Sequence, residues 1–389
     1  MSSSLSASLV SVCFLAFFAT SIVRAQSNVR DLAPATQGVD GPESAAEPLR
    51  VGVAGLVHGH VGWILGREDR GDIEIVGIAE PNRELAQRYA DRYGFSPDLF
   101  HDSVEEMIEA ADPEALTVFT SIYDHLSVTE VAARHGVHVM VEKPLAISND
   151  HARRMKAAAD SAGIHLLTNY ETTWYPSVHQ TQAMVGEGAV GPLRKIVVRD
   201  GHEGPKEIGV GDEFLEWLTD PVQNGGGALI DFGCYGANLI TWLMGGQRPT
   251  SVSAVTQTIK PDIYENVDDE ATIVLTYPEA QGIIQASWNW PFSRKDMSVY
   301  GRTGYIHADN DVDMRVRLDD GEPMRQVEAE RTAYPFDDPF SYLAAVVQGR
   351  TVPADDLSSL ETNMIVVEIL DAARRSAESG ETIYLDGRE

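Results

Sequence analysis

The sequence predicts an α/β protein of two domains: a doubly wound parallel sheet over residues 49–168, then an α+β domain with a large, mainly antiparallel open sheet over residues 169–389. Three observations support this expectation. Strands and helices alternate at short spacing from Leu49, and the alternation gives way to successive longer strands after Asn169. The chain has 389 residues, 43% of them apolar and 23% charged, which is the size and composition of a globular protein with two domains.

The first domain is expected to contain five buried parallel strands, because each candidate is a short apolar run without polar alternation. These strands are predicted at residues 49–54, 73–79, 115–120, 137–141 and 164–168. Apolar residues at helical spacing predict helices between them, at 83–93, 104–110, 126–135 and 149–162. Glycines directly follow two of these helices, at Gly136 and Gly163, as is common at helix ends.

The second domain is expected to begin with a helix at 177–187 and a strand at 194–199. A helix is predicted to start near the Gly225–Gly227 turn and run to residue 244. Further strands are predicted at 250–258, 269–277, 282–290, 297–301, 305–308 and 314–318, and two closing helices at 339–348 and 357–379.

The amino terminus resembles an export signal. Residues 1–25 contain a mostly apolar run from Val10 to Ile22, and Ala25 ends a small-residue cleavage pattern. Residues 26–48 read as a disordered linker rich in Ala, Pro, Gly, Ser and acids. We therefore expect a periplasmic or extracellular mature chain without a membrane span. An uncleaved N-terminal membrane anchor is the alternative, because residues 1–8 carry no Lys or Arg.

Charge excludes some classes of partner. The chain has 59 acidic and 30 basic residues, for a formal net charge of −29. This charge argues against binding to nucleic acid or to anionic membrane surfaces. Adaptation to salt and a GC-rich genome are equally good explanations of the many acids and few lysines.

The turn after the first strand is a candidate dinucleotide site. It reads Gly52-Val-Ala-Gly-Leu-Val-His-Gly-His60, and the candidate contacts are Gly55, Val57 and His58. A regular pattern would have glycine at positions 57 and 60, so an ordinary tight turn is the alternative. Glu80 lies 25 residues beyond Gly55, where an acid binds ribose hydroxyls and repels a 2′-phosphate, which favours NAD over NADP. His58 and His60 have no Cys or acid beside them in sequence, and no metal site is predicted.

Three further residues indicate proton-transfer chemistry. Lys143 directly follows the strand at 137–141 and Glu142, and it precedes Pro144. A lysine there can bond a reacting oxygen, and burial is expected to lower its pKa. Asp231 and Tyr235 are four residues apart, so one helix should project both from the same face. A helix-dipole role for Asp231 and a packing role for Tyr235 remain open.

These motifs resemble the glucose–fructose oxidoreductase / inositol dehydrogenase (Gfo/Idh/MocA) family. The resemblance covers the chain from Leu49 onward, through segments 120–125, 136–139, Glu142-Lys143-Pro144 and 225–235. It implies a Rossmann domain, a second domain with an open sheet, NAD(P), and sugar or polyol substrates. It also implies that Lys143 is the catalytic lysine and that Asp231 is the acid of the family's Asp-x-x-x-His motif.

Tyr235 departs from this pattern, because most members have histidine there. The tyrosine resembles the glucose–fructose oxidoreductase and dihydrodiol dehydrogenase branch, where Tyr235 would exchange the proton and Lys143 would lower its pKa. The expected catalytic residues are Lys143, Asp231 and Tyr235. The expected cofactor-binding residues are Gly55, Val57, His58, Glu80, Thr120, His125, Glu142 and Lys143. Candidate substrate contacts are Asn169, Trp174, His202 and Trp290, with Lys295 and Tyr170 as further candidates.

The resulting hypothesis is an NAD(P)-dependent oxidoreductase that transfers hydride between nicotinamide and a sugar or polyol carbinol. The alternatives are an NAD-assisted glycosidase of the same fold and a non-catalytic sugar-binding protein. Family members commonly pair through their open sheets, so the resemblance also implies a homo-oligomer, either a dimer or a tetramer.

Overall fold

The structure, a computed structural model, describes residues 47–385, which all lie within one compact unit of the chain. The expected signal segment 1–25 and residues 26–46 of the expected linker lie outside the described residues. Within residues 47–385, none of the helices is both long and apolar enough to cross a membrane.

The first sheet is parallel throughout and has the strand order β3-β2-β1-β4-β5-β6. This is the order of a doubly wound dinucleotide-binding fold, so the predicted fold class is confirmed. The sequence did not reveal β3, which has only two residues and therefore no periodicity. The strands are β1 (Leu49–Ala54), β2 (Ile73–Ala79), β3 (Phe100–His101), β4 (Ala115–Val118), β5 (His138–Glu142) and β6 (Leu166–Asn169).

Local sequence explains where the connecting helices begin and end. The Asn82, Ser103 and Ser148 side chains each accept a backbone N–H in the first turn of the helix that follows. Gly136 and Gly163 end two helices in the left-handed conformation. These helices are α1 (Val61–Leu65), α2 (Arg83–Tyr93), α3 (Val104–Ala111), α4 (His125–His135) and α5 (Asn149–Ala162).

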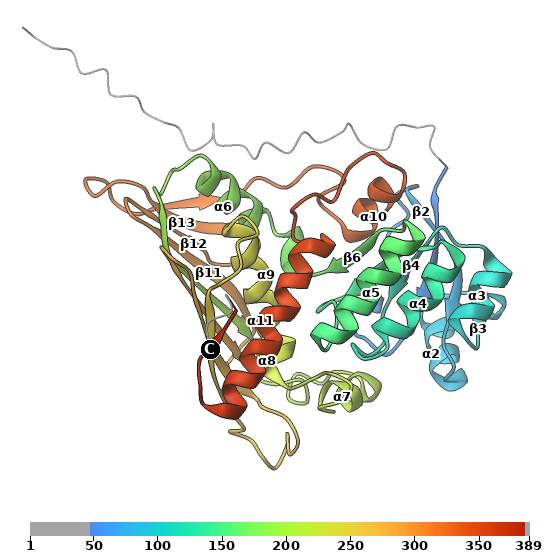
Figure 1. The fold of residues 1–389 in the computed structure, drawn as a ribbon. Helices are drawn as coiled ribbons and strands as arrows, with labels where there is room; N and C mark the ends of the chain where they lie inside the picture. The colour runs from blue at the N-terminus through green and yellow to red at the C-terminus, as the bar shows by residue number, and fades with distance from the viewer. Residues whose placement is uncertain (1–46, 386–389) are drawn as a thin grey trace, which may run out of the picture. The chain divides into compact units, whose positions relative to one another are not determined.

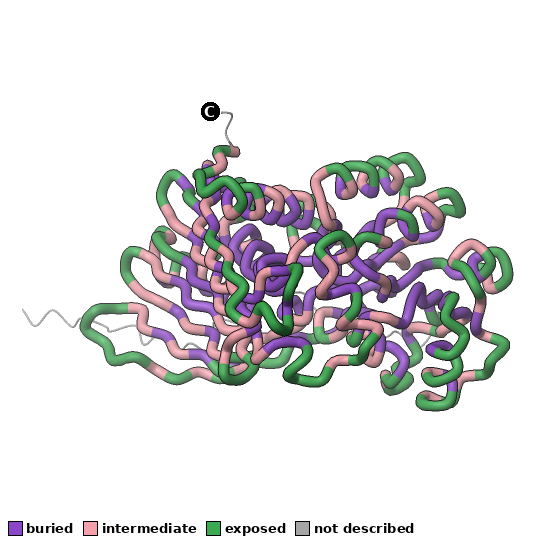
Figure 2. The backbone as a smooth tube through the Cα atoms, turned by 90° about the horizontal axis from the view of Figure 1, so that it is seen from below, coloured by how far each residue is buried: buried purple, intermediate pink, exposed green. Residues whose placement is uncertain are grey.

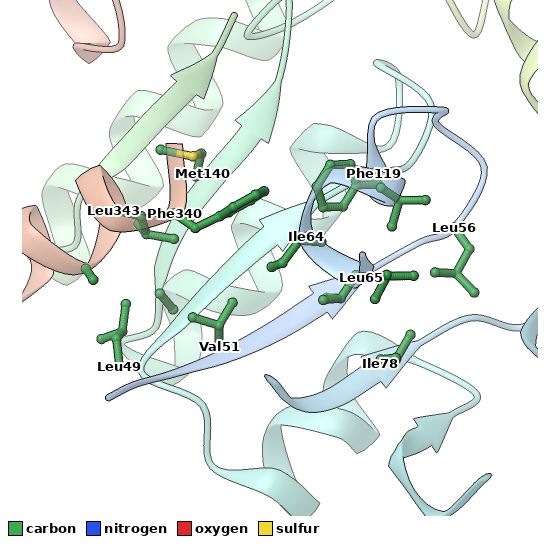
Figure 3. Close-up of a cluster of buried hydrophobic side chains, with 14 of the residues drawn as sticks. Leu49, Val51, Leu56, Ile64, Leu65, Ile78, Phe119, Met140, Phe340 and Leu343 are labelled. Carbon is green, nitrogen blue, oxygen red and sulfur yellow. The ribbon is translucent and has the colours of Figure 1, made fainter. Parts of the chain in front are cut away.

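A helix from the end of the chain completes the core of the first domain. Phe340 and Leu343 of α10 (Pro339–Val347) join the buried cluster that contains Leu49 and Val51 of β1 (Figure 3). The Rossmann domain therefore includes residues far beyond the expected boundary at 168, which itself falls inside β6.

The second sheet has nine strands in the order β14-β13-β12-β11-β7-β10-β9-β8-β15. β7 and β10 pair in parallel and the other neighbours pair antiparallel, which confirms the mainly antiparallel sheet. Buried and half-buried positions alternate along several of these strands (Figure 2). The strands are β7 (Leu193–Gly201), β8 (Ser251–Gln257), β9 (Glu270–Thr276), β10 (Gln281–Ser287), β11 (Arg294–Gly301), β12 (Tyr305–Ala308), β13 (Asp313–Arg317), β14 (Arg325–Glu328) and β15 (Ile383–Tyr384).

Helices pack against this sheet and connect it to the first domain (Figure 1). The long α11 contacts β8 and α9 on one side and α5 and β6 on the other. The predicted continuous helix from the glycine turn to residue 244 is wrong, because the chain breaks at Phe232 into two helices. The helices of this half are α6 (Pro176–Gly186), α7 (Asp212–Leu218), α8 (Ala228–Asp231), α9 (Gly233–Leu243) and α11 (Leu360–Ser379), with the short 3-10 helix η3 (Glu171–Trp174) after β6.

Candidate active site

Lys143 and Asp231 meet between the two domains. Lys143 directly follows β5, at the carboxyl edge of the parallel sheet, and its side chain is buried. Its Nζ donates to Asp231 Oδ1 at 2.5 Å and to the Asp231 carbonyl oxygen at 3.0 Å. Trp288 Nε1 donates to the other carboxylate oxygen, Oδ2, at 2.9 Å. Both oxygens of Asp231 are therefore bonded, and the lysine is fixed in position.

This pairing reverses one expectation about Lys143. Burial is the largest single effect and lowers the pKa of Lys143, but Asp231, together with Cys234 and Glu142, outweighs burial, and the pKa is raised. For Asp231, burial favours the neutral acid, while Lys143 favours the carboxylate and lowers the pKa overall. The expected lowering of the Lys143 pKa is therefore wrong, because the sequence did not reveal how closely Asp231 approaches.

Tyr235 lies beside this pair, although it stands on a different helix from Asp231. Its side chain is buried, and Lys143 Nζ lies 5.0 Å from the centroid of its ring. Lys295 Nζ lies 5.1 Å from the same centroid. Burial, followed by the negative charge of Glu171, holds the pKa of Tyr235 well above its usual value. The expected lowering by Lys143 is therefore not what dominates here.

Glu142 organises the adjacent part of the cleft. Its Oε1 accepts from Asn169 Nδ2 at 2.7 Å, and its Oε2 lies 3.0 Å from His60 Nδ1. Trp174 Nε1 in turn donates to Asn169 Oδ1 at 2.9 Å. Asn169 and Trp174, expected as substrate contacts, thus act here by orienting Glu142.

The structure brings Glu142 to the two histidines of the turn. Ligand atoms of His58, His60 and Glu142 all lie within 4.8 Å of one another, so these residues could hold a metal ion. Sequence analysis missed this grouping because Glu142 is 82 residues from His60. Hydrogen bonds already use the groups: His58 Nδ1 accepts from the His60 N–H, and His60 Nδ1 bonds Glu142. We therefore derive no metal-dependent step from this cluster.

Both histidines are neutral at ordinary pH. Burial lowers the pKa of His58 well below its usual value, and the charge state of His60 has a smaller effect in the same direction. Burial, reinforced by Lys143 and Lys295, lowers the pKa of His60 to about 3.

The turn after β1 has the close backbone approach of a dinucleotide-binding turn. Gly55 has φ +82°, and a Cβ there would lie 2.7 Å from Thr120 Cγ2, so glycine is required. Glu80 is buried, and its two oxygens accept from the backbone N–H groups of Leu56 and Asn82 at 2.9 and 2.8 Å. Glu80 thus ties the turn to the end of β2, and its contact with ribose stays a prediction.

A segment of the second domain covers this turn. Trp217 Nε1 of α7 donates to the Val57 carbonyl at 3.3 Å, and the Phe214 ring lies 4.7 Å from the ring of His58. The sequence did not predict a role for either aromatic, because α7 lies outside the motifs that indicated the site. His58 Nε2 is buried without a hydrogen-bond partner among residues 47–385, so a polar atom there is free to bond a ligand.

His125 occupies the start of α4 and is bonded to the segment that follows Lys143. It is fully buried, and its Nδ1 lies 3.2 Å from the Leu145 carbonyl oxygen, which connects α4 to the segment after Lys143. Burial lowers its pKa to about 4. Its Nε2 has no partner in the described part of the chain, as at His58.

A cavity of about 370 Å³ extends from the turn after β1 to Lys143, Asp231 and Tyr235. His202 lines this cavity, whereas Trp290, Asn169 and Trp174 do not, and contact of any of the four with a substrate stays a prediction. Trp290 instead bonds the Asp200 carbonyl oxygen at 3.4 Å and stacks with Arg294. The residues around the cavity include His58, His60, Lys143, His202, Asp231, Tyr235 and Lys295.

These features fit a nicotinamide dinucleotide. The glycine turn, the unpartnered His58 nitrogen and the cavity lie in succession at the carboxyl edge of the parallel sheet, where such cofactors bind. Val57 and Gly55 would approach the pyrophosphate, and Lys143 with Tyr235 would face the reacting carbon.

Comparison with known proteins gives the same assignment. Residues 49–170 match the model of the oxidoreductase family with an NAD-binding Rossmann fold, and residues 178–307 match the Gfo/Idh/MocA C-terminal domain. Trans-1,2-dihydrobenzene-1,2-diol dehydrogenase of Oryctolagus cuniculus is 30% identical over 62% of this chain and 68% of its own. The same-named protein of Sus scrofa is 27% identical over 62% of this chain and 67% of its own.

Solved structures share the fold. The aldose-aldose oxidoreductase of Caulobacter crescentus superposes with a TM-score of 0.74 and 23% identity, covering 87% of this chain and 100% of its own. An inositol dehydrogenase homolog of Azotobacter vinelandii, solved with NAD+, gives 0.78 and 17%, covering 89% and 100%. With its fold, its cleft and both family matches in agreement, the chain belongs to the Gfo/Idh/MocA family of NAD-binding oxidoreductases.

Proposed function

We propose that this oxidoreductase acts on the CH–OH group of a sugar or polyol, with Tyr235 exchanging the hydroxyl proton. The observation that carries the proposal is the buried cluster of Lys143, Asp231 and Tyr235 on the wall of the 370 Å³ cavity. Relatives named for a diol, an aldose and inositol support this substrate class.

Each residue of the cluster has a distinct part in the reaction. When bound, the nicotinamide dinucleotide accepts or supplies the hydride. Lys143, kept charged and fixed by Asp231, is placed to donate a hydrogen bond to the reacting oxygen. In reduction, Tyr235 donates its phenol proton to the reacting oxygen, and in oxidation its tyrosinate form takes the hydroxyl proton. The indole N–H of Trp288 donates to Asp231 Oδ2 and fixes the carboxylate, so the bonded lysine keeps its orientation.

The test uses Tyr235→Phe and Lys143→Met in the full chain, with Lys156→Met as the control. Lys156 is a half-exposed lysine of α5 that pairs with Asp160, away from the cleft. We expect each cleft variant to lower kcat by about 10²–10⁴-fold on the substrate found by screening sugars and polyols with NAD and NADP. The control should keep the wild-type rate, and NAD binding measured by calorimetry should persist in Tyr235→Phe.

Three results would contradict the proposal. Wild-type turnover by Tyr235→Phe would leave that residue a packing role alone. Cleavage of a glycoside without accumulation of NADH would favour the NAD-assisted glycosidase, and failure to bind either cofactor would favour the sugar-binding protein.

We propose NAD rather than NADP as the cofactor. Glu80 places a carboxyl group at the end of β2, where it disfavours a 2′-phosphate. The ratio of kcat/KM for the two cofactors tests this choice, and a ratio favouring NADP would overturn it.

The remaining proposals concern location and assembly. Residues 1–25 support export, and N-terminal sequencing of the protein from its native cells should start at Gln26; an intact Met1 terminus would contradict cleavage.

The half-exposed face of the second sheet, with Val255 exposed on β8, supports a homo-oligomer. Sedimentation analysis should give a dimer or tetramer, and a monomer at micromolar concentration would exclude it.

A further inference from the structure

Tyr235 has a second charged neighbour that the reaction described above does not use. Lys295 of β11 reaches the same ring as Lys143, at 5.1 Å from the centroid, and forms an ion pair with Glu171 of η3. The Glu171 carboxylate also accepts the hydroxyl of Tyr175. Glu171 and Lys295 thus form an ion pair beside Tyr235. The pair joins η3 to β11, and neither residue belongs to α9, the helix that carries the tyrosine.

The two lysines beside Tyr235 differ in how their charges are compensated. The charge of Lys143 is largely compensated by Asp231, which bonds it through two oxygens. Asp200 lies opposite Lys295 in the sheet, but it is buried without partners among the described residues. Burial raises the pKa of Asp200 well above its usual value, which favours the neutral acid, whereas Glu171 is the ion-pair partner of Lys295.

Glu171 also has the largest charge effect on Tyr235. After burial, its carboxylate is the main cause that raises the pKa of Tyr235, ahead of Cys234, Glu142 and Asp231. Lys295 in turn lowers the pKa of Glu171 against the effect of burial, so Glu171 stays ionised. The anion that raises the pKa of Tyr235 is therefore paired with a cation whose Nζ lies 5.1 Å from the centroid of the same buried ring.

We propose that Glu171 and Lys295 are a positioning pair that sets the proton affinity of the Tyr235 hydroxyl. The proposal rests on the proposed function, in which Tyr235 exchanges the substrate proton. Glu171 strengthens the hold of Tyr235 on its proton, and Lys295 weakens it. Lys295 lines both the 370 Å³ cavity and a neighbouring cavity of about 750 Å³, so substrate binding there would change the balance directly.

The test exploits the opposite signs of the two charges. Glu171→Gln removes the anion, and this removal stabilises the tyrosinate form of Tyr235. The Tyr235-dependent limb of the pH profile of kcat should therefore move to lower pH. Lys295→Met removes the cation and leaves Glu171 unpaired, so the same limb should move to higher pH. Lys295→Arg keeps the charge and should leave the limb near its wild-type position. A merely structural pair would lower the rate without opposite shifts.

Controls and a second readout keep the test decisive. Lys156→Met and Glu361→Gln alter a charge pair 4.0 Å apart on α5 and α11 and should shift neither limb. Ultraviolet absorbance of the tyrosinate, taken as each protein minus its Tyr235→Phe counterpart, follows Tyr235 without substrate or cofactor. It should appear at lower pH in Glu171→Gln than in wild type. Shifts of the same sign in both variants, or no shift in either readout, would overturn the proposal. Wild-type turnover by Tyr235→Phe with an intact absorbance shift would instead overturn the proposed function alone.

Discussion

At the scale of single residues, the site is built around the buried pair of Lys143 and Asp231, whose carboxylate also accepts the indole N–H of Trp288. Lys143, Asp231 and Tyr235 were singled out by type and spacing, and the fold brings them together. The indole of Trp288 on Asp231 was not predicted, because it depends on the register of β10 and the turn that follows it. Charge compensation between Lys143 and Asp231 was missed for the same reason: 88 residues separate them, and only folding sets their distance.

The buried ion pair leads to a stability prediction. Both side chains are 6% exposed, so Asp231→Asn would leave the Lys143 ammonium without its counter-charge in a buried site. We expect Asp231→Asn to lower the free energy of unfolding by about 3–5 kcal/mol, measured by urea denaturation at pH 7.

A double-mutant cycle separates the pair from other contacts of Asp231. Lys143→Met combined with Asp231→Asn removes both charges, so the double variant should be more stable than the sum of the single effects predicts. Additive effects would mean that the two charges do not stabilise each other. The pair would then serve catalysis alone.

At the scale of elements, the strands and helices with strong periodicity were predicted, and the irregular ones were not. The parallel strands other than β3, and the helices α2 to α5, agree with apolar runs and caps in the sequence. The break between α8 and α9 at Phe232 was not predicted, since Ala228 to Leu243 is almost continuously apolar and no proline marks an end. This break places Asp231 at the end of one helix and Tyr235 in the first turns of the next.

Close packing at the Gly225–Gly227 turn fixes the start of α8. A Cβ on Gly227 would lie 1.8 Å from the carbonyl oxygen of Asp268, and the Asp268 carboxylate accepts the N–H groups of Gly227 and Leu229. Gly227→Ala must therefore push α8 away from the residue that caps it. We expect a loss of about 3 kcal/mol or more in the free energy of unfolding, together with loss of activity, because Asp231 ends this helix.

Gly186→Ala is the matched control for this prediction. Gly186 is exposed at the end of α6, with open space around its would-be Cβ. The same substitution there should be neutral or stabilising by up to about 1 kcal/mol, as judged by thermal and urea unfolding. Equal effects of the two substitutions would show that the Asp268 contact does not constrain α8.

At the scale of the whole molecule, the excess of acids acts on stability rather than on the fold. The formal net charge of −29 makes the compact state repel itself, because folding brings the carboxylates closer together. Several ion pairs oppose this repulsion, among them the largely buried contacts of Arg67 with Asp72 and Asp338 at 2.8 and 2.9 Å. Buried pairs are screened by salt much less than exposed charges.

Added salt should therefore stabilise this protein. The Debye length is about 10 Å at 0.1 M ionic strength. Salt therefore weakens the repulsion between exposed carboxylates and leaves the Arg67 contacts nearly unchanged. We expect the melting temperature, followed by intrinsic fluorescence at pH 7.5, to rise steadily as NaCl increases from about 0.02 to 0.5 M. Sucrose at matched osmolality is the control, since it stabilises without screening and should not reproduce the steep rise at low concentration. A melting temperature that falls over this range would contradict the prediction. It would mean that exposed ion pairs stabilise the folded protein by more than the repulsion among the excess acids destabilises it.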